Sequence, residues 1–189
     1  MGEIIEISIV SKDENLLMNF LSFISLQIDN TTKEIVEIMD NWQYENVETI
    51  DSIELAKTFI GNKIVCITEE SGRCQAGVHI EPIEDLLLYN MWFNLESLSS
   101  EVEYANLIDE FVGYISDCGG IKNIIIGAIG KETKFEYLGD SKTTISEAHI
   151  DVWLINKTDS LNSILGEYKM LANIYYEDMY KEMLVLSKL

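Results

Sequence analysis

Basic residues are scarce in this chain of 189 residues. It has 13 Lys and Arg against 33 Asp and Glu, and the formal net charge is -20 at pH 7. Such a chain is repelled by nucleic-acid phosphates and by anionic lipid headgroups. We therefore exclude nucleic acid and membrane surfaces as direct partners, whereas a basic protein partner fits the sign of the charge.

Proline is nearly absent, and no stretch is rich in glycine and serine. The one proline is Pro82, and 47% of the residues are hydrophobic. A chain of this length buries a substantial core when it folds as one unit, and nothing in it has the composition of a linker. The sequence predicts a single domain over residues 1-189.

The three cysteines, Cys66, Cys74 and Cys118, are odd in number and have no C-x-x-C spacing. We expect free, reduced and buried thiols. A tight turn at Ser71-Gly72 would place Cys66 opposite Gly77 on a paired strand, so that Cys66 and Cys74 do not face each other.

Long apolar runs are missing as well. No stretch approaches the roughly 18-20 apolar residues that a helix needs to cross a bilayer. Residues 1-10 carry no basic residue and so do not have the pattern of a secretory signal. We expect a cytoplasmic protein.

The clearest pattern lies between Glu84 and Gly130. Apolar residues alternate from Leu87 to Leu95, which is typical of a strand with one buried face. Ser100 and Glu103 have the spacing of a capping box at the start of a helix, and Gly119-Gly120 ends that helix. Three isoleucines at 124-126 then predict a buried strand.

The remaining patterns add strands and helices on both sides of this stretch. Strands are expected over 3-10, 34-40, 63-68, 74-80, 133-138 and 148-155, and helices over 13-28 and from Asp51 or Ser52 to Ile60. Residues 41-51 read as an edge strand or an ordered loop. Helices mixed with hairpin-linked strands favour an α+β fold with a mixed, mostly antiparallel sheet and helices packed on it.

A long C-terminal helix is predicted from Asp159 or Ser160 to about Ser187. Apolar residues alternate there at spacings of four and three, at Leu161, Leu165, Tyr168, Ala172, Tyr175 and Met179. The tail around Tyr180, Met183, Leu184 and Leu186 stays apolar. We expect burial of that tail, within the chain or in a homodimer.

The sequence contains little that indicates a catalytic site. There is no G-x-S-x-G and no phosphate-binding glycine pattern, and Cys118 lies at a helix C-terminus, where the helix dipole opposes a thiolate. A metal site could draw on His79, Glu81, Glu84 and Asp85, but the other histidine, His149, is distant in sequence. An ordinary surface strand is the preferred interpretation, and no catalytic residue or cofactor is assigned.

Asn90, Trp92 and Asn94 occupy the less apolar face of the strand at 86-95. They could line a polar groove or meet a partner, or a helix that satisfies their amides could cover them. With Glu81, Glu84 and Asp85 they form our candidate partner-binding set.

In its small, acidic, single-domain α+β build without a catalytic constellation, the chain resembles immunity proteins of bacterial polymorphic-toxin and contact-dependent inhibition systems. This resemblance implies a protein that binds and blocks a cognate toxin, often a basic nuclease. It carries no family motif, so it assigns no functional residue.

Three functions follow. The first is a cytoplasmic binding protein, without enzymatic activity, that neutralises a basic protein partner. The second is a domain that binds a small molecule or metal, or acts as an enzyme, with its site near His79-Asp85. The third is a self-associating structural domain that uses the last helix.

Overall fold

The computed structural model describes residues 4-28, 31-72, 74-95, 100-118, 123-131, 150-156, 175-180 and 183-188. Its centre is one sheet with the strand order β3-β2-β4-β5-β6-β1-β7-β8-β10-β9. Each neighbouring pair of strands runs antiparallel. The strands are β1 (Ile5–Ser11), β2 (Lys33–Met39), β3 (Glu48–Thr49), β4 (Ile64–Ser71), β5 (Cys74–Ile83), β6 (Leu86–Asn94), β7 (Ile124–Lys131), β8 (Val152–Asn156), β9 (Tyr175–Tyr180) and β10 (Met183–Lys188).

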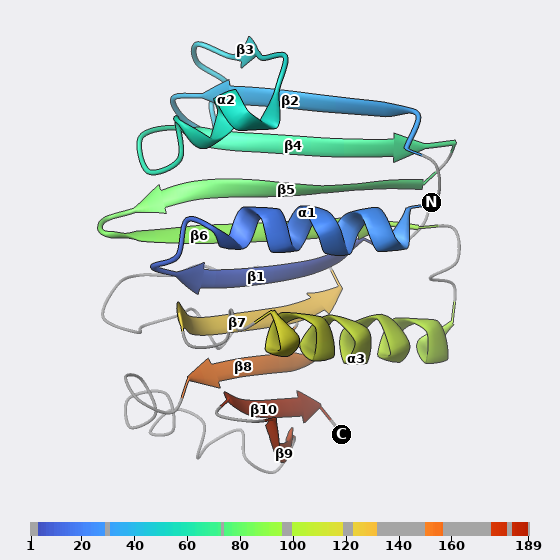
Figure 1. Cartoon of the computed structure of the whole chain (residues 1–189). Coiled ribbons are helices and arrows are strands. Elements are labelled where there is room, and N and C mark those ends of the chain that lie inside the picture. The colour runs from blue at the N-terminus through green and yellow to red at the C-terminus, as the bar shows by residue number, and fades with distance from the viewer. Residues whose placement is uncertain are drawn as a thin grey trace.

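Three helices pack on the same face of this sheet: α1 (Leu16–Gln27), α2 (Ile53–Lys57) and α3 (Glu101–Asp117). In Figure 1 they lie in front of the strands, with α1 across the middle of the sheet and α3 nearer β7. Helices and strands therefore form two layers, and the predicted α+β fold is confirmed. None of the helices in the described ranges is long and apolar enough to cross a membrane.

Local sequence explains where two of these helices begin. The Ser100 side chain accepts a hydrogen bond from the Glu103 N–H, and the Glu103 carboxylate accepts one from the Ser100 N–H. This is the predicted capping box. Ser52 caps α2 in the same way through the Leu55 N–H. Ser11, the last residue of β1, donates to the Asn123 carbonyl and accepts from the Asp13 N–H, so it joins the start of the connection to α1 to the residue before β7.

The main core lies between the helices and the sheet, and aromatic rings dominate its centre. Phe20 of α1 meets the ring of Tyr89 on β6 at 5.1 Å, edge to face. Phe23 meets Phe93 at 6.0 Å and Phe111 of α3 at 5.3 Å. The Tyr89 hydroxyl donates to the Asp13 carbonyl at 2.7 Å. These contacts hold α1 over β6, the strand at the centre of the sequence pattern, and pack α3 against α1.

The opposite face of the sheet differs between its two halves. On β1, β7 and β8 this face is largely buried, as at Val10, Ile126 and Trp153. On β5 and β6 its side chains are half-buried and mostly polar, as at His79 and Asn90. The half-buried part is where the sequence placed its candidate residues.

The prediction of a long C-terminal helix is wrong over residues 175-180 and 183-188. These residues form β9 and β10, which pair with each other, and β10 also pairs with β8. Helical spacing and strand alternation both fit a short apolar and aromatic segment, and the open edge of β8 decides between them through its hydrogen bonds. The homodimer that rested on this helix therefore loses its basis. The rest of the predicted helix, and the strand predicted at 133-138, lie outside the described residues.

The hairpin between β4 and β5 is displaced from the predicted register. Ser71 pairs with Cys74, so Ser71 belongs to the strand and not to the turn, and Cys66 lies opposite His79. Gly72 has φ 61°, a left-handed value that favours glycine at this turn. The cysteines are free as predicted, but only Cys66 is buried, whereas Cys74 is half-buried and Cys118 exposed.

Candidate functional site

The structure places the six candidate residues in two groups. Glu81, Asn90, Trp92 and Asn94 lie on the sheet face opposite the helices, as register and burial show. Glu84 and Asp85 form the exposed turn between β5 and β6, where Glu84 has φ 55°. Asn90, Trp92 and Asn94 therefore share one face of β6 as the alternation predicted, and Glu81 joins them from β5.

The indole of Trp92 lies against the neighbouring strand because the residue opposite it is a glycine, Gly77. The two residues pair across the strands, and a Cβ added at Gly77 would lie 2.9 Å from the indole Nε1. The next pair along is His79 and Asn90. The Asn90 Oδ1 and Trp92 Nε1 atoms are buried and have no hydrogen-bond partner among the described residues. These two groups pack as part of the sheet surface rather than projecting from it.

A third tryptophan reaches this face from the connection between β2 and β3. Residues 40-47 form a loop that is held together by hydrogen bonds between its own residues. The Asn41 side chain accepts from the Gln43 N–H at 3.0 Å, and the Asp40 N–H donates to the Glu45 carbonyl at 3.2 Å. Tyr44 and Asn46 both have positive φ. This compact loop presents Trp42 with 40% of its surface exposed.

Trp42 bridges the loop to β5. Its indole N–H donates to the Glu81 carboxylate at 2.9 Å, and its ring lies 5.3 Å from the His79 imidazole. His79 in turn lies 6.4 Å from Trp92. The order Trp42, His79, Trp92 is therefore an aromatic row that crosses from the loop to β6. We call these three side chains the aromatic row.

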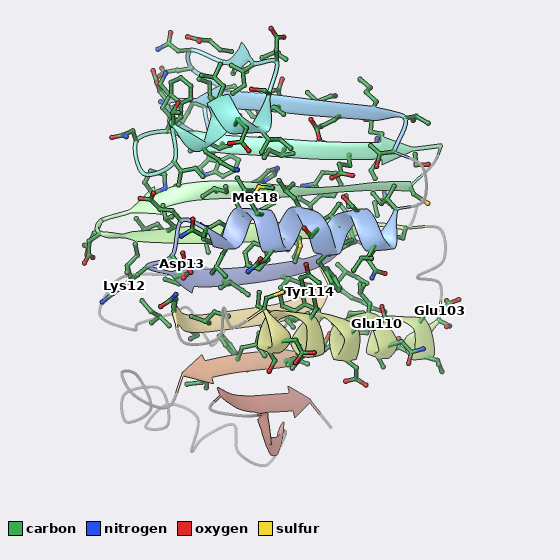
Figure 2. All side chains as sticks on the ribbon, in the orientation of Figure 1. Lys12, Asp13, Met18, Glu103, Glu110 and Tyr114 are labelled. Atoms are coloured by element: carbon green, nitrogen blue, oxygen red, sulfur yellow. The ribbon has the colours of Figure 1, made fainter. Side chains whose placement is uncertain are left out.

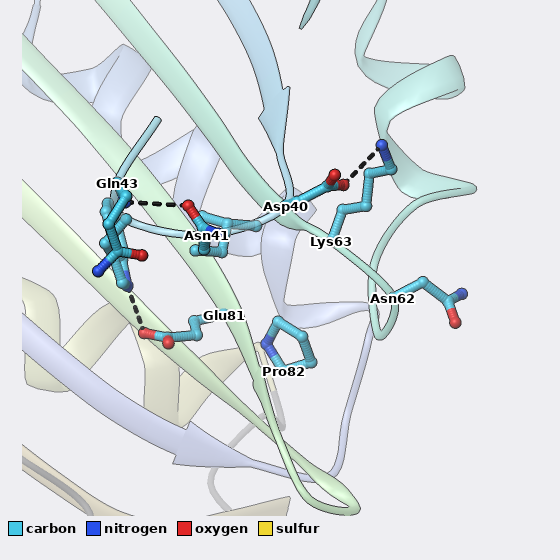
Figure 3. A pocket seen from close by; sticks show the side chains of 9 residues that line it. Asp40, Asn41, Gln43, Asn62, Lys63, Glu81 and Pro82 are labelled. Carbon is cyan, nitrogen blue, oxygen red and sulfur yellow. Dashed lines mark hydrogen bonds and ion pairs between the residues drawn. The ribbon is translucent and has the colours of Figure 1, made fainter. Parts of the chain in front are cut away.

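A cavity of about 200 Å³ opens beside Trp42 (Figure 3). It lies between the 40-47 loop, the start of β4 and the last residues of β5. Trp42, Pro82 and Ile64 give it apolar walls. The polar part of the lining is Asp40, Asn41, Gln43, Asn62, Lys63 and Glu81. The cavity is smaller than the roughly 300-1,000 Å³ usual for ligand pockets and its lining is mostly polar, so it has room for one side-chain group rather than for a large ligand.

The charged groups of this cavity are not balanced. Lys63 Nζ lies 2.9 Å from Asp40 Oδ1, and the Asn46 amide donates to Asp40 Oδ2 at 2.6 Å. The hydrogen bonds from Asn46 and Lys63 hold the pKa of Asp40 below its usual value. Glu81 has the neutral Trp42 N–H as its partner. The lining thus carries one more negative than positive charge.

His79 is a packing group in this arrangement. Burial lowers its pKa below the ordinary value of 6.5, because the charged imidazolium loses hydration there. It stands between two indole rings as a neutral imidazole at pH 7. Within the described residues no group of three or more His, Cys, Asp and Glu side chains could hold a metal ion. Glu81 faces Trp42, and Glu84 and Asp85 lie in the turn.

Sequence reasoning missed Trp42, Asp40 and Lys63. Trp42 belongs to the segment 41-51, which was predicted only as an edge strand or an ordered loop, and Asp40 and Lys63 were predicted only as the ends of strands. A tryptophan among asparagine and glutamine at 41-46 was the one available signal, because such residues form turns that expose a ring. The distance of Trp42 from β5 in sequence concealed the contact with Glu81.

A scan against protein-family models and a search of curated proteins found no match to this chain.

Proposed function

We propose that this protein binds and neutralises a basic protein partner, in the manner of the immunity proteins that block bacterial toxins. It acts in the cytoplasm and by binding alone. The proposal rests above all on the charge that remains on the surface after the internal ion pairs are formed.

Four basic side chains of the described residues form ion pairs with carboxylates of the same chain. Lys33, Lys57, Lys63 and Lys131 each lie within 4 Å of a carboxylate, of Glu70, Glu54, Asp40 and Glu101 respectively. Most of the other carboxylates of the described residues are exposed or half-buried, and they outnumber the basic groups there. A surface of this kind attracts a basic partner over distances comparable to the Debye length and raises the association rate.

Helix α3 shows the excess most clearly. Glu101, Glu103, Asp109, Glu110 and Asp117 are all exposed, and α3 contains no Lys or Arg. Figure 2 shows Glu103 and Glu110 on this helix. Glu110 accepts a hydrogen bond from the Gln27 amide of α1, a neutral partner that leaves its charge in place. The exposed carboxylates of α3 can thus attract a basic partner from a distance, and this attraction needs no specific binding pocket.

Specific contact is better supplied on the opposite face. Tryptophan is enriched among the residues that dominate binding energy at interfaces. Trp42 is the exposed ring here, with Glu81 beside it and with Glu84 and Asp85 in the adjacent turn. Asn90, Trp92 and Asn94 extend the surface along β6. We assign the partner contact to this face.

The test begins with capture of the partner by the tagged full-length protein from the cells that make it, and continues with both purified proteins. We expect a basic protein whose association rate falls about tenfold or more between roughly 0.02 and 0.5 M salt. We also expect its activity to be inhibited at equal molar amounts. An association rate that does not change with salt, or a bound partner that stays fully active, would contradict the proposal.

A further inference from the structure

The cavity beside Trp42 has the shape and charge of a site for one planar cation. We propose that it receives the guanidinium group of an arginine side chain of the partner protein. This inference rests on the proposed function and names the group that the partner supplies.

The position of Glu81 is the first argument. Its Oε2 atom accepts the Trp42 N–H, and no cationic side chain of the described residues pairs with Glu81. Asp40, the other carboxylate of the cavity, is engaged at both oxygens by Lys63 and Asn46. The negative charge that lacks a counterion therefore belongs to Glu81, and a single monovalent cation would balance the lining.

The walls distinguish arginine from other cations. An exposed indole face and a proline ring favour a flat, weakly hydrated guanidinium over a compact ammonium, because the guanidinium stacks on aromatic rings. The carboxamides of Asn62 and Gln43 line the same space and offer oxygen acceptors. The guanidinium of arginine has five N–H donors, whereas the ammonium of lysine has three. A cavity with many hydrogen-bond acceptors therefore suits arginine better than lysine.

The loop is built in advance for such a contact. The hydrogen bonds within residues 40-47 and the Asp40–Lys63 pair hold Trp42 over the cavity before any partner arrives. Figure 3 shows Glu81 below the loop, joined to it by the bond from Trp42. Binding then orders few additional groups, which limits its entropic cost.

The experiment titrates the full-length protein with N-acetyl-arginine methylamide and follows the indole N–H signal of Trp42 by NMR. The citrulline derivative has nearly the same shape without the charge, and the lysine derivative has the charge without the plane. We expect a saturable shift with the arginine probe, a weaker one with lysine and none with citrulline.

Two variants make the test specific. Glu81→Gln removes the charge in the cavity and should weaken arginine binding about fivefold or more, as expected for loss of a charge-assisted hydrogen bond. Asp109→Asn removes an equal charge from the exposed side of α3 and should change binding less than about twofold. Equal shifts with arginine and citrulline, or equal effects of the two variants, would overturn the inference.

The outcome is separable from that of the proposed function. If a basic partner binds with its salt dependence intact and Glu81→Gln binds it as tightly as the natural chain, the arginine site is wrong and the function stands. If no basic protein binds at all while the arginine probe still shifts Trp42, the cavity recognises a free cation and the proposed partner is wrong.

Discussion

The two faces of the sheet differ in what they bury. The face under α1 and α3 is almost wholly apolar, and its aromatic rings interlock with those of the helices. The opposite face of β5 and β6 carries His79, Glu81, Asn90 and Trp92, which are half-buried. The same strands supply both sets, because successive side chains point to opposite sides.

This difference separates folding from recognition. The helix-covered face stabilises the protein, and a change there is felt as lost stability. The opposite face keeps polar and aromatic groups at partial exposure, where they contribute less to folding and remain available to a partner. The changes below are chosen to break or sharpen this division, and they run from the largest expected effect to the smallest.

Replacing Phe111 with alanine should have the largest effect. This ring is fully buried and contacts Phe20 and Phe23. A buried phenylalanine replaced by alanine costs about 3-5 kcal/mol through lost burial and the cavity left behind. Chemical denaturation would measure the change in unfolding free energy. A loss below about 1 kcal/mol would show that the aromatic contacts do not hold the two layers together.

Replacing Gly77 with alanine tests the opposite face. The new Cβ would lie 2.5 Å from the Ile67 carbonyl oxygen and 2.9 Å from Trp92 Nε1, so strand and ring must both shift. We expect a loss of about 1-3 kcal/mol and altered tryptophan fluorescence. Gly72→Ala is the control, since that site is open but has φ 61°. It should lose about 1-2 kcal/mol from backbone strain and leave the fluorescence unchanged. Unchanged fluorescence in Gly77→Ala would mean that Trp92 does not rest on this glycine.

Acidification should destabilise the aromatic row. Burial lowers the pKa of His79 in the folded chain below 6.5, so below that pH the unfolded chain binds a proton that the folded chain does not. Stability therefore falls as the pH drops from 6.5 through the folded pKa, by at most about 1.4 kcal/mol per pH unit for this one group. Denaturation curves of the natural chain and of His79→Gln, recorded from pH 7.5 to 5, isolate the effect. Parallel pH profiles for the two proteins would refute it.

Thiol reactivity should report burial without changing stability. Burial raises the pKa of Cys66 to about 12, and the nearby Glu37 carboxylate adds to the shift. At pH 8 this thiol stays protonated and covered, whereas Cys118 is exposed. An aromatic disulfide reagent should label Cys118 quickly and Cys66 only after unfolding, as mass spectrometry of labelled peptides would show. Rapid labelling of Cys66 in the native protein would indicate that its face of β4 opens.

Much of this division was predictable from the sequence. Alternation at Leu87-Leu95 predicted both faces of β6, and the serines at 52 and 100 predicted two helix starts, because each signal is local. The end of the chain was mispredicted, since residues 175-188 fit either period and only the free edge of β8 selects strands. The cavity was missed because Trp42 meets Glu81 through a loop, and no local pattern encodes that contact.

The sequence also misplaced one register by two residues. A serine and a glycine at 71-72 look like a complete turn, but pairing of Ser71 with Cys74 lengthens both strands and keeps apolar residues such as Val65 and Ile80 opposite each other. A shift of two residues leaves every side chain on its original face of the sheet, so the apolar pattern fits either register and could not decide between them.

The central claim is that the face opposite the helices, rather than the acidic helix layer, contacts the basic partner. The dissociation constants of the purified complex for Glu81→Gln and Asp109→Asn test it most directly, because each variant removes one negative charge, from the cavity and from α3 respectively. The account predicts a loss of affinity of about fivefold or more for Glu81→Gln and of less than about twofold for Asp109→Asn. The reverse order, or equal losses, would contradict it.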